Sequence, residues 1–344
     1  MSNLSRDNHY LSQMYLEAWK NNDNKVEVYD LLVPNSRVPK WKPKSTKSIG
    51  SLDSIFVRLN NGTETDDIEK WFNEKYESPS KEALNHAINN EKITVEEWHH
   101  LIDFVACHIV RSPSFIIKIL KLAQEKAPVI FQKNCDDISK MSAQELYKAI
   151  KQHKITESDK KNDDLFPIKF TKINNESNKT NLLIETMIGK QFYLYIMKYL
   201  LEETSKVFHN YKWGIITVDA NVSLPTSDDP VICLNYRSED NYNFGGGWGS
   251  KNSNILFPIS PNKILYTQIE AKIKSRWILD YKTSMLLKKM IVEHSHRKII
   301  SNFKDPEIEK IKPRYVNLEE FLREKEIWKN FQKDYLEKEA EYIK

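Results

Sequence analysis

The sequence of 344 residues has little cysteine and little glycine. Its three cysteines, Cys107, Cys135 and Cys233, stand far apart, which excludes a disulfide framework and a Cys-x-x-Cys zinc motif. Four of the eight glycines lie together in 245–249. No helix is predicted after them and no Lys-Ser/Thr pair is attached, so a phosphate-binding loop is excluded and a hairpin tip is indicated.

Long apolar runs are also missing. The most apolar segment, 182–201, is interrupted by Glu185, Lys190, Gln191 and Lys198, which is typical of a core helix and not of a membrane span. No charged segment followed by an apolar one opens the chain, so no secretion signal is predicted. Together with reduced cysteines, these absences predict a cytoplasmic protein without a membrane partner.

An excess of charge of one sign is the third absence. Fifty-two Lys and Arg residues stand against 48 Asp and Glu, which gives a net charge of +4. This balance excludes a dedicated nucleic-acid binder with a strongly basic surface, although it permits a polyanion as partner. A hydrophobic content of 40% is enough to form a substantial core, so the chain is expected to be folded.

The periodicity of apolar residues predicts an α+β fold, predominantly helical, with a small antiparallel sheet. The sheet is expected to contain strands near 26–31, 213–218, 231–236, 255–259 and 264–269. Helices are predicted near 8–19, 66–89, 94–110, 115–126, 182–208, 277–296 and 318–342.

The helix predicted near 94–110 has the clearest start signal, because Thr94-x-x-Glu97 forms a capping box there. Arg111-Ser112-Pro113 is predicted to break it, since proline disfavours helical geometry in the preceding residue and suits the first position of a new helix. The polar segment 132–180 then indicates a boundary or a surface insertion with one weak helix at 143–153.

The segment Thr226–Pro230 joins two of the predicted strands and carries adjacent carboxylates. Such a joint between buried strands holds charged groups in fixed positions, and it is equally the place for an ordinary Asx-turn. Hard oxygen ligands suit Mg²⁺ or Mn²⁺, so Asp228 and Asp229 are candidate metal ligands.

Four short motifs stand out along the chain: 8–16 (NHYLSQMYL), 111–113 (RSP), 226–231 (TSDDPV) and 257–261 (FPISP). In their order and spacing, they resemble the bacterial domain of unknown function family 4238. The resemblance covers about residues 8–302. It implies a single large domain over 1–305, followed by a charged helical extension at 306–344. The extension's helix either packs on the domain or binds a protein partner. The family carries no settled activity, and a bacterial defence or toxin setting would fit it.

The polar residues inside these motifs are the candidate site. We hypothesise that five side chains meet in one cleft: His9, Gln13, Arg111, Ser227 and Asp228. A histidine at a helix start stays neutral and is suited to move a proton. An arginine between two helices is suited to bind an anion. The aspartate would orient the histidine or hold the metal.

Each of these residues also has a structural interpretation. His9 is suited to cap its helix, and Ser227 to form a turn. Arg111 is suited to bind the exposed carbonyls at the end of its own helix, or to pair with Asp228. The histidines at 99, 100, 294 and 296 are interpreted as surface residues.

A cleft with histidine, arginine and aspartate is most economically a phosphoester hydrolase. RNA or DNA is the expected substrate, and the basic stretch Lys40–Lys47 is a candidate contact for its backbone. The alternative is a non-catalytic binding module, in which the same residues form a structural polar network or a site for a small anion.

Overall fold

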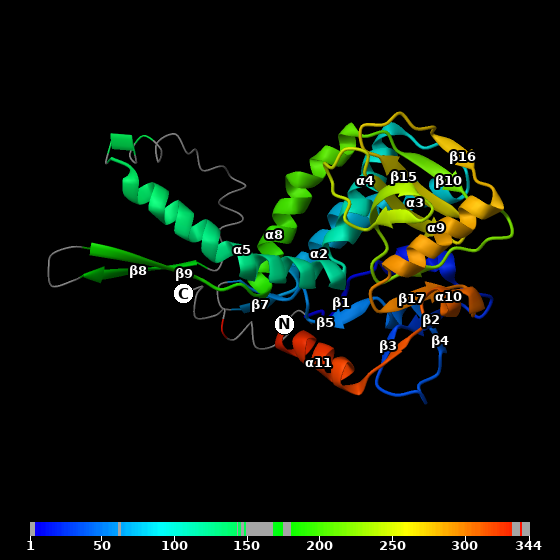
Figure 1. Ribbon diagram of the computed structural model, residues 1–344, viewed down its shortest axis with the longest axis horizontal. Coiled ribbons are helices and arrows are strands. Elements are labelled where there is room, and N and C mark those ends of the chain that lie inside the picture. Colours follow the sequence, from blue (N-terminus) through cyan, green and yellow to red (C-terminus); the bar gives the residue numbers. More distant parts are fainter. Residues whose placement is uncertain are drawn as a thin grey trace.

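The computed structural model describes residues 4–60, 63–142, 168–174 and 180–331, together with positions 144, 145, 148 and 338. The helix predicted at 143–153, much of the polar insertion and the end of the C-terminal helix lie outside the described residues. The described part combines helices with several sheets (Figure 1), and the predicted α+β class is therefore confirmed.

The larger sheet has six strands in the order β13-β12-β14-β15-β10-β16. Its neighbours are antiparallel except β10 and β16, which are parallel. The strands are β10 (Gly214–Thr217), β12 (Ile232–Ser238), β13 (Asn241–Asn243), β14 (Asn254–Ser260), β15 (Lys263–Gln268) and β16 (Arg276–Ile278). Four of the five predicted strands belong to this sheet.

Both faces of the six-stranded sheet are buried, because successive side chains of a strand point to opposite faces. Ile215 and Phe257 pack into the main core with helix α4 (Val95–Val110). Their neighbours Ile216 and Leu256 pack on the other face, against helix α9 (Tyr281–His294). The sequences of these strands are therefore continuously apolar and do not alternate between apolar and polar residues.

A second sheet has four antiparallel strands in the order β11-β17-β2-β4. The strands are β2 (Val26–Asp30), β4 (Trp41–Lys44), β11 (Thr226–Ser227) and β17 (Lys298–Ser301). The predicted strand at 26–31 belongs here, so the prediction of one small antiparallel sheet is wrong. Strands distant in the chain pair with each other, such as Thr226 with Ile300, and local sequence patterns do not specify such pairs.

Four two-stranded pairs complete the described sheets. They are β1 (Asp7–His9) with β5 (Ser51–Asp53), β3 (Leu32–Val33) with β18 (Tyr315–Val316), β6 (Arg58–Asn60) with β7 (Thr63–Thr65), and β8 (Ile168–Asn174) with β9 (Thr180–Thr186). Only the pair β3 and β18 is parallel among these four.

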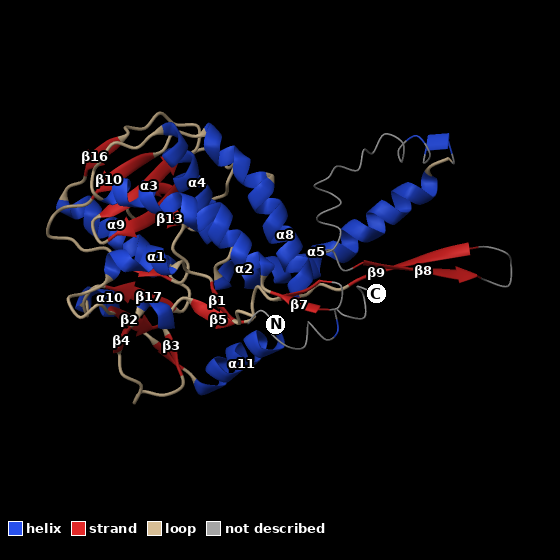
Figure 2. Ribbon diagram, turned by 180° about the vertical axis from the view of Figure 1, so that it is seen from behind, coloured by secondary structure: helices blue, strands red, loops and turns tan. Residues whose placement is uncertain are grey.

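The remaining described helices are α1 (Gln13–Leu16), α2 (Asp67–Phe72), α3 (Ser78–Ile88), α5 (Pro113–Lys140), α8 (Lys190–Glu202), α10 (Pro306–Ile311) and α11 (Leu318–Lys329). Figure 2 shows α5 and the β8–β9 hairpin projecting together from the body. No single helix of the described chain has the length and apolar composition needed to cross a membrane. Helices α4 and α5 pass that test only as a pair bent by 61°.

The predicted capping box of α4 is confirmed, with Thr94 and Glu97 each bonding the other's backbone N–H. Ser112 opens the next helix, as predicted, because its Oγ accepts the N–H of Phe115 at 3.3 Å. That helix runs much further than expected, with Pro128 inside it.

The helix predicted at 182–208 is wrong at its start. Residues 180–186 form β9, which pairs with β8, and the helix α8 begins only at Lys190. Because the run Leu182–Ile184 is too short to show a period, its apolar character alone favoured a helix. The predicted first and last helices of the domain are likewise shortened by the strands β1 and β16.

Tyr15 of α1 links the two large sheets. Its hydroxyl lies 2.5 Å from Thr226 Oγ1 of β11 and donates to the carbonyl of Pro258 in β14 at 2.8 Å. The ring stacks on Phe257 with centroids 4.9 Å apart. Three of the four sequence motifs therefore meet at one buried hydroxyl.

We expect Tyr15→Phe to lower the free energy of unfolding by about 1 to 3 kcal/mol, because the carbonyl of Pro258 would be left buried without its donor. Urea denaturation measures this loss. Tyr199→Phe is the control, because Tyr199 is 49% exposed and its hydroxyl can exchange with water. Equal stability of the two variants would contradict the assigned role of Tyr15.

Candidate functional site

His9 and Gln13 line an open cleft of about 500 Å³ beside α2, here called the His9 cleft. The amide of Gln13 lies 2.9 Å from Nε2 of His9. Because the amide nitrogen donates, Nε2 accepts, and a neutral His9 ring then carries its proton on Nδ1. His9 lies on β1, four residues before α1 begins, so the predicted position at a helix start is wrong.

Glu69 is the carboxylate nearest to His9 in this cleft. Its Oε1 accepts the backbone N–H of His9 at 3.2 Å and lies 3.9 Å from Nδ1 of the ring. Burial raises the pKa of Glu69 to about 7, although the neighbouring guanidinium of Arg111 lowers it. Oε2 of Glu69 is buried and has no hydrogen-bond partner among the described residues.

Arg111 lies behind the His9 cleft and is fully buried. Its Nη2 donates to Oε1 of Glu77 at 2.6 Å, and its guanidinium lies 5.0 Å from the centre of the Phe72 ring. Nε and Nη1 have no partner in the described chain. A wholly buried arginine does not reach a ligand in the cleft, so the predicted anion clamp is wrong, and its partner is Glu77 instead of Asp228.

Glu77 reaches Arg111 from an irregular part of the helix. Residues Asn73–Glu77 form a π-helical turn between α2 and α3. Such turns insert one extra residue per hydrogen-bonded ring, cost stability and recur at functional sites. Here the turn ends on Glu77, which lines the His9 cleft and pairs with the buried guanidinium.

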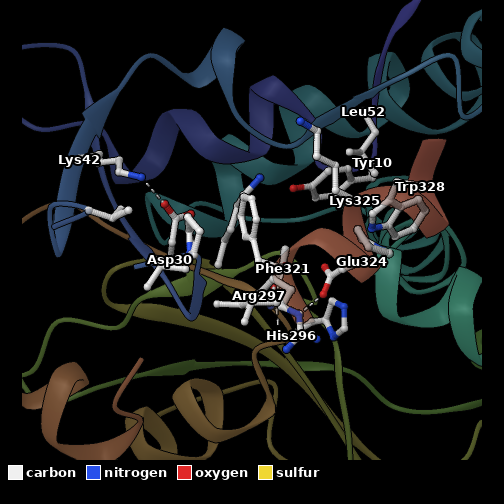
Figure 3. A pocket seen from close by; sticks show the side chains of 17 residues that line it. Tyr10, Asp30, Lys42, Leu52, His296, Arg297, Phe321, Glu324, Lys325 and Trp328 are labelled. Atoms are coloured by element: carbon white, nitrogen blue, oxygen red, sulfur yellow. Dashed lines mark hydrogen bonds and ion pairs between the residues drawn. The ribbon is translucent and has the colours of Figure 1, made fainter. Parts of the chain in front are cut away.

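A second pocket, of about 420 Å³, lies between the four-stranded sheet and α11 and is here called the Lys298 pocket (Figure 3). Figure 3 shows Lys42 and Asp30 on one side of it and Trp328 of α11 on the other. Its polar lining consists of Tyr10, Asp30, Lys42, Asp228, His296, Arg297, Lys298, Glu324 and Lys325.

Lys298, which is half-buried, lies near the buried Tyr10 in this pocket. The ammonium and the phenol lie close enough to interact electrostatically. Interaction with Tyr10 and then with Asp228 raises the pKa of Lys298, although burial lowers it. Burial also raises the pKa of Tyr10. At neutral pH the lysine is therefore charged and the phenol keeps its proton.

Asp228 holds the wall of the Lys298 pocket together. Its Oδ1 accepts the backbone N–H groups of His296 and Arg297, both at 3.1 Å, and its Oδ2 accepts that of Arg297 at 2.8 Å. These bonds tie the segment 226–230 to the turn between α9 and β17. Ser227 forms a local turn, in which its Oγ donates to the carbonyl of Asp229 at 2.9 Å.

Asp229 lies in a third pocket, apart from Asp228. Its Oδ2 accepts from Oγ of Ser114 at 2.5 Å and lies 3.8 Å from Nε2 of His294. The two aspartates therefore do not share the predicted Mg²⁺ or Mn²⁺ ion. Nowhere in the described ranges are three or more His, Cys, Asp or Glu side chains grouped so that they could hold a metal.

The prediction that all five motif residues meet in one cleft is wrong. His9 and Gln13 line one pocket and Asp228 another, while Arg111 and Ser227 are buried. The reason is the extended backbone at the end of β1, where Tyr10 directly follows His9. Adjacent residues of an extended segment point to opposite sides, so His9 enters the His9 cleft and Tyr10 enters the Lys298 pocket.

Four polar residues of these pockets were missed. Glu69 and Glu77 stand among other charged residues of a helix, and nothing in their spacing separates them from a solvated face. Lys298 is the first residue of the strand β17, and a charge next to an apolar run ordinarily marks only the end of a strand. His296 was interpreted as a surface residue. It lines the Lys298 pocket instead, and its Nε2 is buried without a partner among the described residues.

The fold and its pockets define a mixed α+β protein with an acidic cleft and a lysine-bearing pocket on either side of one strand. The family model described as "Protein of unknown function (DUF4238)" matches residues 7–305, and the chain belongs to this family. Neither the curated proteins nor the solved structures contain a match to the chain. The function is therefore argued from the geometry.

The raised pKa of Glu69 has a consequence for stability. Its carboxyl binds a proton more tightly in the folded chain than in the unfolded chain, whose ordinary value is 4.5. This contribution to stability is complete below about pH 4.5 and is lost as the pH rises to about 7. We therefore compare the change in the free energy of unfolding that Glu69→Gln causes at two pH values. That change is expected to be more favourable at about pH 7.5 than at about pH 4, by on the order of 1 to 3 kcal/mol. Denaturation at both pH values measures the difference, and an equal effect at both would refute it.

Replacing Arg111 tests the buried ion pair. Arg111→Met leaves the carboxylate of Glu77 without its cation, and we expect a loss of about 3 kcal/mol in the free energy of unfolding. The double variant Arg111→Met/Glu77→Gln should recover part of that loss, because no uncompensated charge remains. Chemical denaturation of both variants provides the measurement. A loss below about 1 kcal/mol in the single variant would show that the pair is not structural.

Proposed function

We propose that the protein is a phosphoester hydrolase that acts on nucleic acid in the Lys298 pocket. The observation that carries this proposal is the half-buried, charged ammonium of Lys298, which lies near a phenol in a pocket that also presents an imidazole. A half-buried cation supports a phosphate-binding role, because solvent weakens its attraction for an anion less than that of an exposed cation.

The two pockets differ in charge, and the difference favours the Lys298 pocket. Its lining has four Lys or Arg residues and three Asp or Glu residues, whereas the His9 cleft has one lysine and three carboxylates. Two of the four cations are already paired, Lys42 with Asp30 at 2.7 Å and Arg297 with Glu324 at 2.5 Å. Lys298 and the exposed Lys325 are the cations left to face a phosphate.

Asp228 interacts electrostatically with Lys298 and raises its pKa, while the carboxylate oxygens accept backbone N–H groups. Its role in the proposal is to position the residues that follow α9. The backbone of His296 and Arg297 is held by this carboxylate, and Lys298 comes next in the chain. The carboxylate thus orders the cationic wall of the pocket.

The proposed reaction is an in-line attack of water on phosphorus. Nε2 of His296 accepts a proton from the attacking water, and a bond forms between the water oxygen and phosphorus. Lys298 stabilises the charge on the phosphoryl oxygens. The bond to the leaving oxygen breaks, and the Tyr10 hydroxyl donates the proton that this oxygen needs.

Nucleic acid is proposed as the substrate because the basic stretch Lys40–Lys47 adjoins the pocket. Lys42 of this stretch lines the pocket itself, and Lys44 and Lys47, which follow it in the chain, are exposed. Exposed lysines that follow a pocket edge suit the phosphates of a polymer, which continue beyond the one being cleaved.

A binding module without catalysis is the second candidate. Tyr10 and Asp228 are nearly inaccessible, with exposures of 2% each, and this favours a rigid pocket that holds an anion without changing it. The two candidates differ in one measurable property, which is product formation.

We expect His296→Gln to reduce cleavage of RNA or DNA at least about 100-fold, because general acid–base catalysis contributes on the order of 10² to 10⁴. Lys298→Met should reduce both cleavage and binding. The assay follows the products of labelled single-stranded and duplex substrates on a gel, with and without Mg²⁺ or Mn²⁺.

His100→Gln is the matched control, because His100 of α4 is absent from the lining of both pockets and lies 3.9 Å from Glu96. It should cleave like the unaltered protein. Binding without any product in the unaltered protein would favour the binding module. Undiminished cleavage by a folded His296→Gln variant would remove the proposed base.

A further inference from the structure

We propose that α11 is the wall that selects the substrate, and that Trp328 stacks on an unpaired nucleobase while the adjoining phosphate meets Lys298. This inference rests on the proposed function for the choice of ligand, and it adds which form of nucleic acid the pocket accepts. It is carried by the position of α11, by the spacing of its side chains and by the size of the pocket.

Helix α11 closes the pocket from outside the part of the chain that matches the family. The match ends at residue 305, whereas α11 begins at Leu318. The strand β18 attaches the segment by pairing with β3, and the N–H of Asn317 donates to the carbonyl of Val33 at 3.0 Å. The helix is therefore a fixed addition at the mouth of the pocket.

Arg297 holds α11 in place from the pocket side. Its Nε donates to Glu324 at 2.5 Å, and its Nη2 lies 3.6 Å from Glu320. The same residue's backbone N–H is bound by Asp228. One residue thus connects the cationic wall to the helix that faces it (Figure 3).

The pocket-facing residues of α11 are Phe321, Glu324, Lys325 and Trp328. Their spacing of three, four and seven residues places them on one face of the helix. Such a stripe ordinarily packs into a core, yet no residue of α11 is fully buried. Trp328 packs partly against the main core and edge-on against Phe331, with ring centroids 5.9 Å apart, and it also lines the pocket.

The chemistry of the two walls fits a nucleotide. Indole and phenyl rings on α11 offer a flat apolar surface to a base, and Lys298 and Lys42 on the sheet offer charge to a phosphate. A volume of about 420 Å³ lies at the small end of pockets for single ligands. A base in a duplex is stacked and paired, so only an unpaired or extruded nucleotide enters.

Because every base has a π-face, stacking on Trp328 predicts little preference among the four bases. It predicts a strong preference for single strands over duplexes. These two expectations separate α11 from a surface that merely attracts phosphate, which would bind both forms of nucleic acid.

The test is equilibrium binding, measured by fluorescence anisotropy of a short labelled single strand and of the same sequence in a duplex. We expect Trp328→Leu to weaken single-strand binding by about 5-fold to 100-fold, the range that corresponds to the loss of one stacked base. Trp328→Phe should retain most of the affinity. Leu322→Ala is the control, because Leu322 is 52% exposed on the same helix and lies outside the lining of the pocket.

Circular dichroism and melting of each variant show whether α11 remains folded. Unchanged single-strand affinity in a folded Trp328→Leu variant would overturn the inference, as would equal affinity of the unaltered protein for both forms. Single-strand binding that depends on Trp328 without any cleavage would support the inference and overturn the proposed hydrolase. If the protein cleaves both forms and Trp328→Leu leaves that cleavage unchanged, the result would support the proposed hydrolase and overturn the inference about Trp328.

Discussion

The carboxylate of Asp228 and the backbone N–H groups that it accepts connect the parts of this protein on which its proposed site depends. A buried carboxylate is costly unless donors surround it, and here His296 and Arg297 supply them. The turn between α9 and β17 is therefore held against β11 of the same sheet. The residues of that turn form the cationic wall of the Lys298 pocket, and the side chain of Arg297 reaches on to α11.

The N-terminal motif forms the partition between the two pockets. His9 and Tyr10 are neighbours in sequence, yet one faces carboxylates and the other faces lysine. The pockets therefore have opposite electrostatic character although a single chain segment separates them. Tyr15, a little further along, ties the partition to both large sheets. A site of either kind needs this segment rigid, and its buried hydrogen bonds provide the rigidity.

Much of the secondary structure followed from local patterns. The capping box at Thr94, the break at Pro113 and the strands flanking Thr226 were predicted, because each depends on residues within a few positions of one another. The helix expected at 182–208 failed, since its first apolar residues pair instead with β8. Of the candidate site, His9 and Gln13 were brought together as expected. Arg111 was expected to bind an anion in the same cleft, with a pair to Asp228 as the structural alternative, and it is buried and paired with Glu77.

The sequence by itself determined which segments become helices and strands, and which polar residues stand among apolar ones. Those properties depend on backbone propensity and on the period of apolar residues, and both act locally. Only the tertiary structure decided that the strands divide into separate sheets and that Asp228 and Asp229 face different pockets. It also decided that Lys298 and His296 line a pocket with α11. These outcomes depend on pairings between distant segments, where each buried polar group binds whichever donor or acceptor the fold brings within reach.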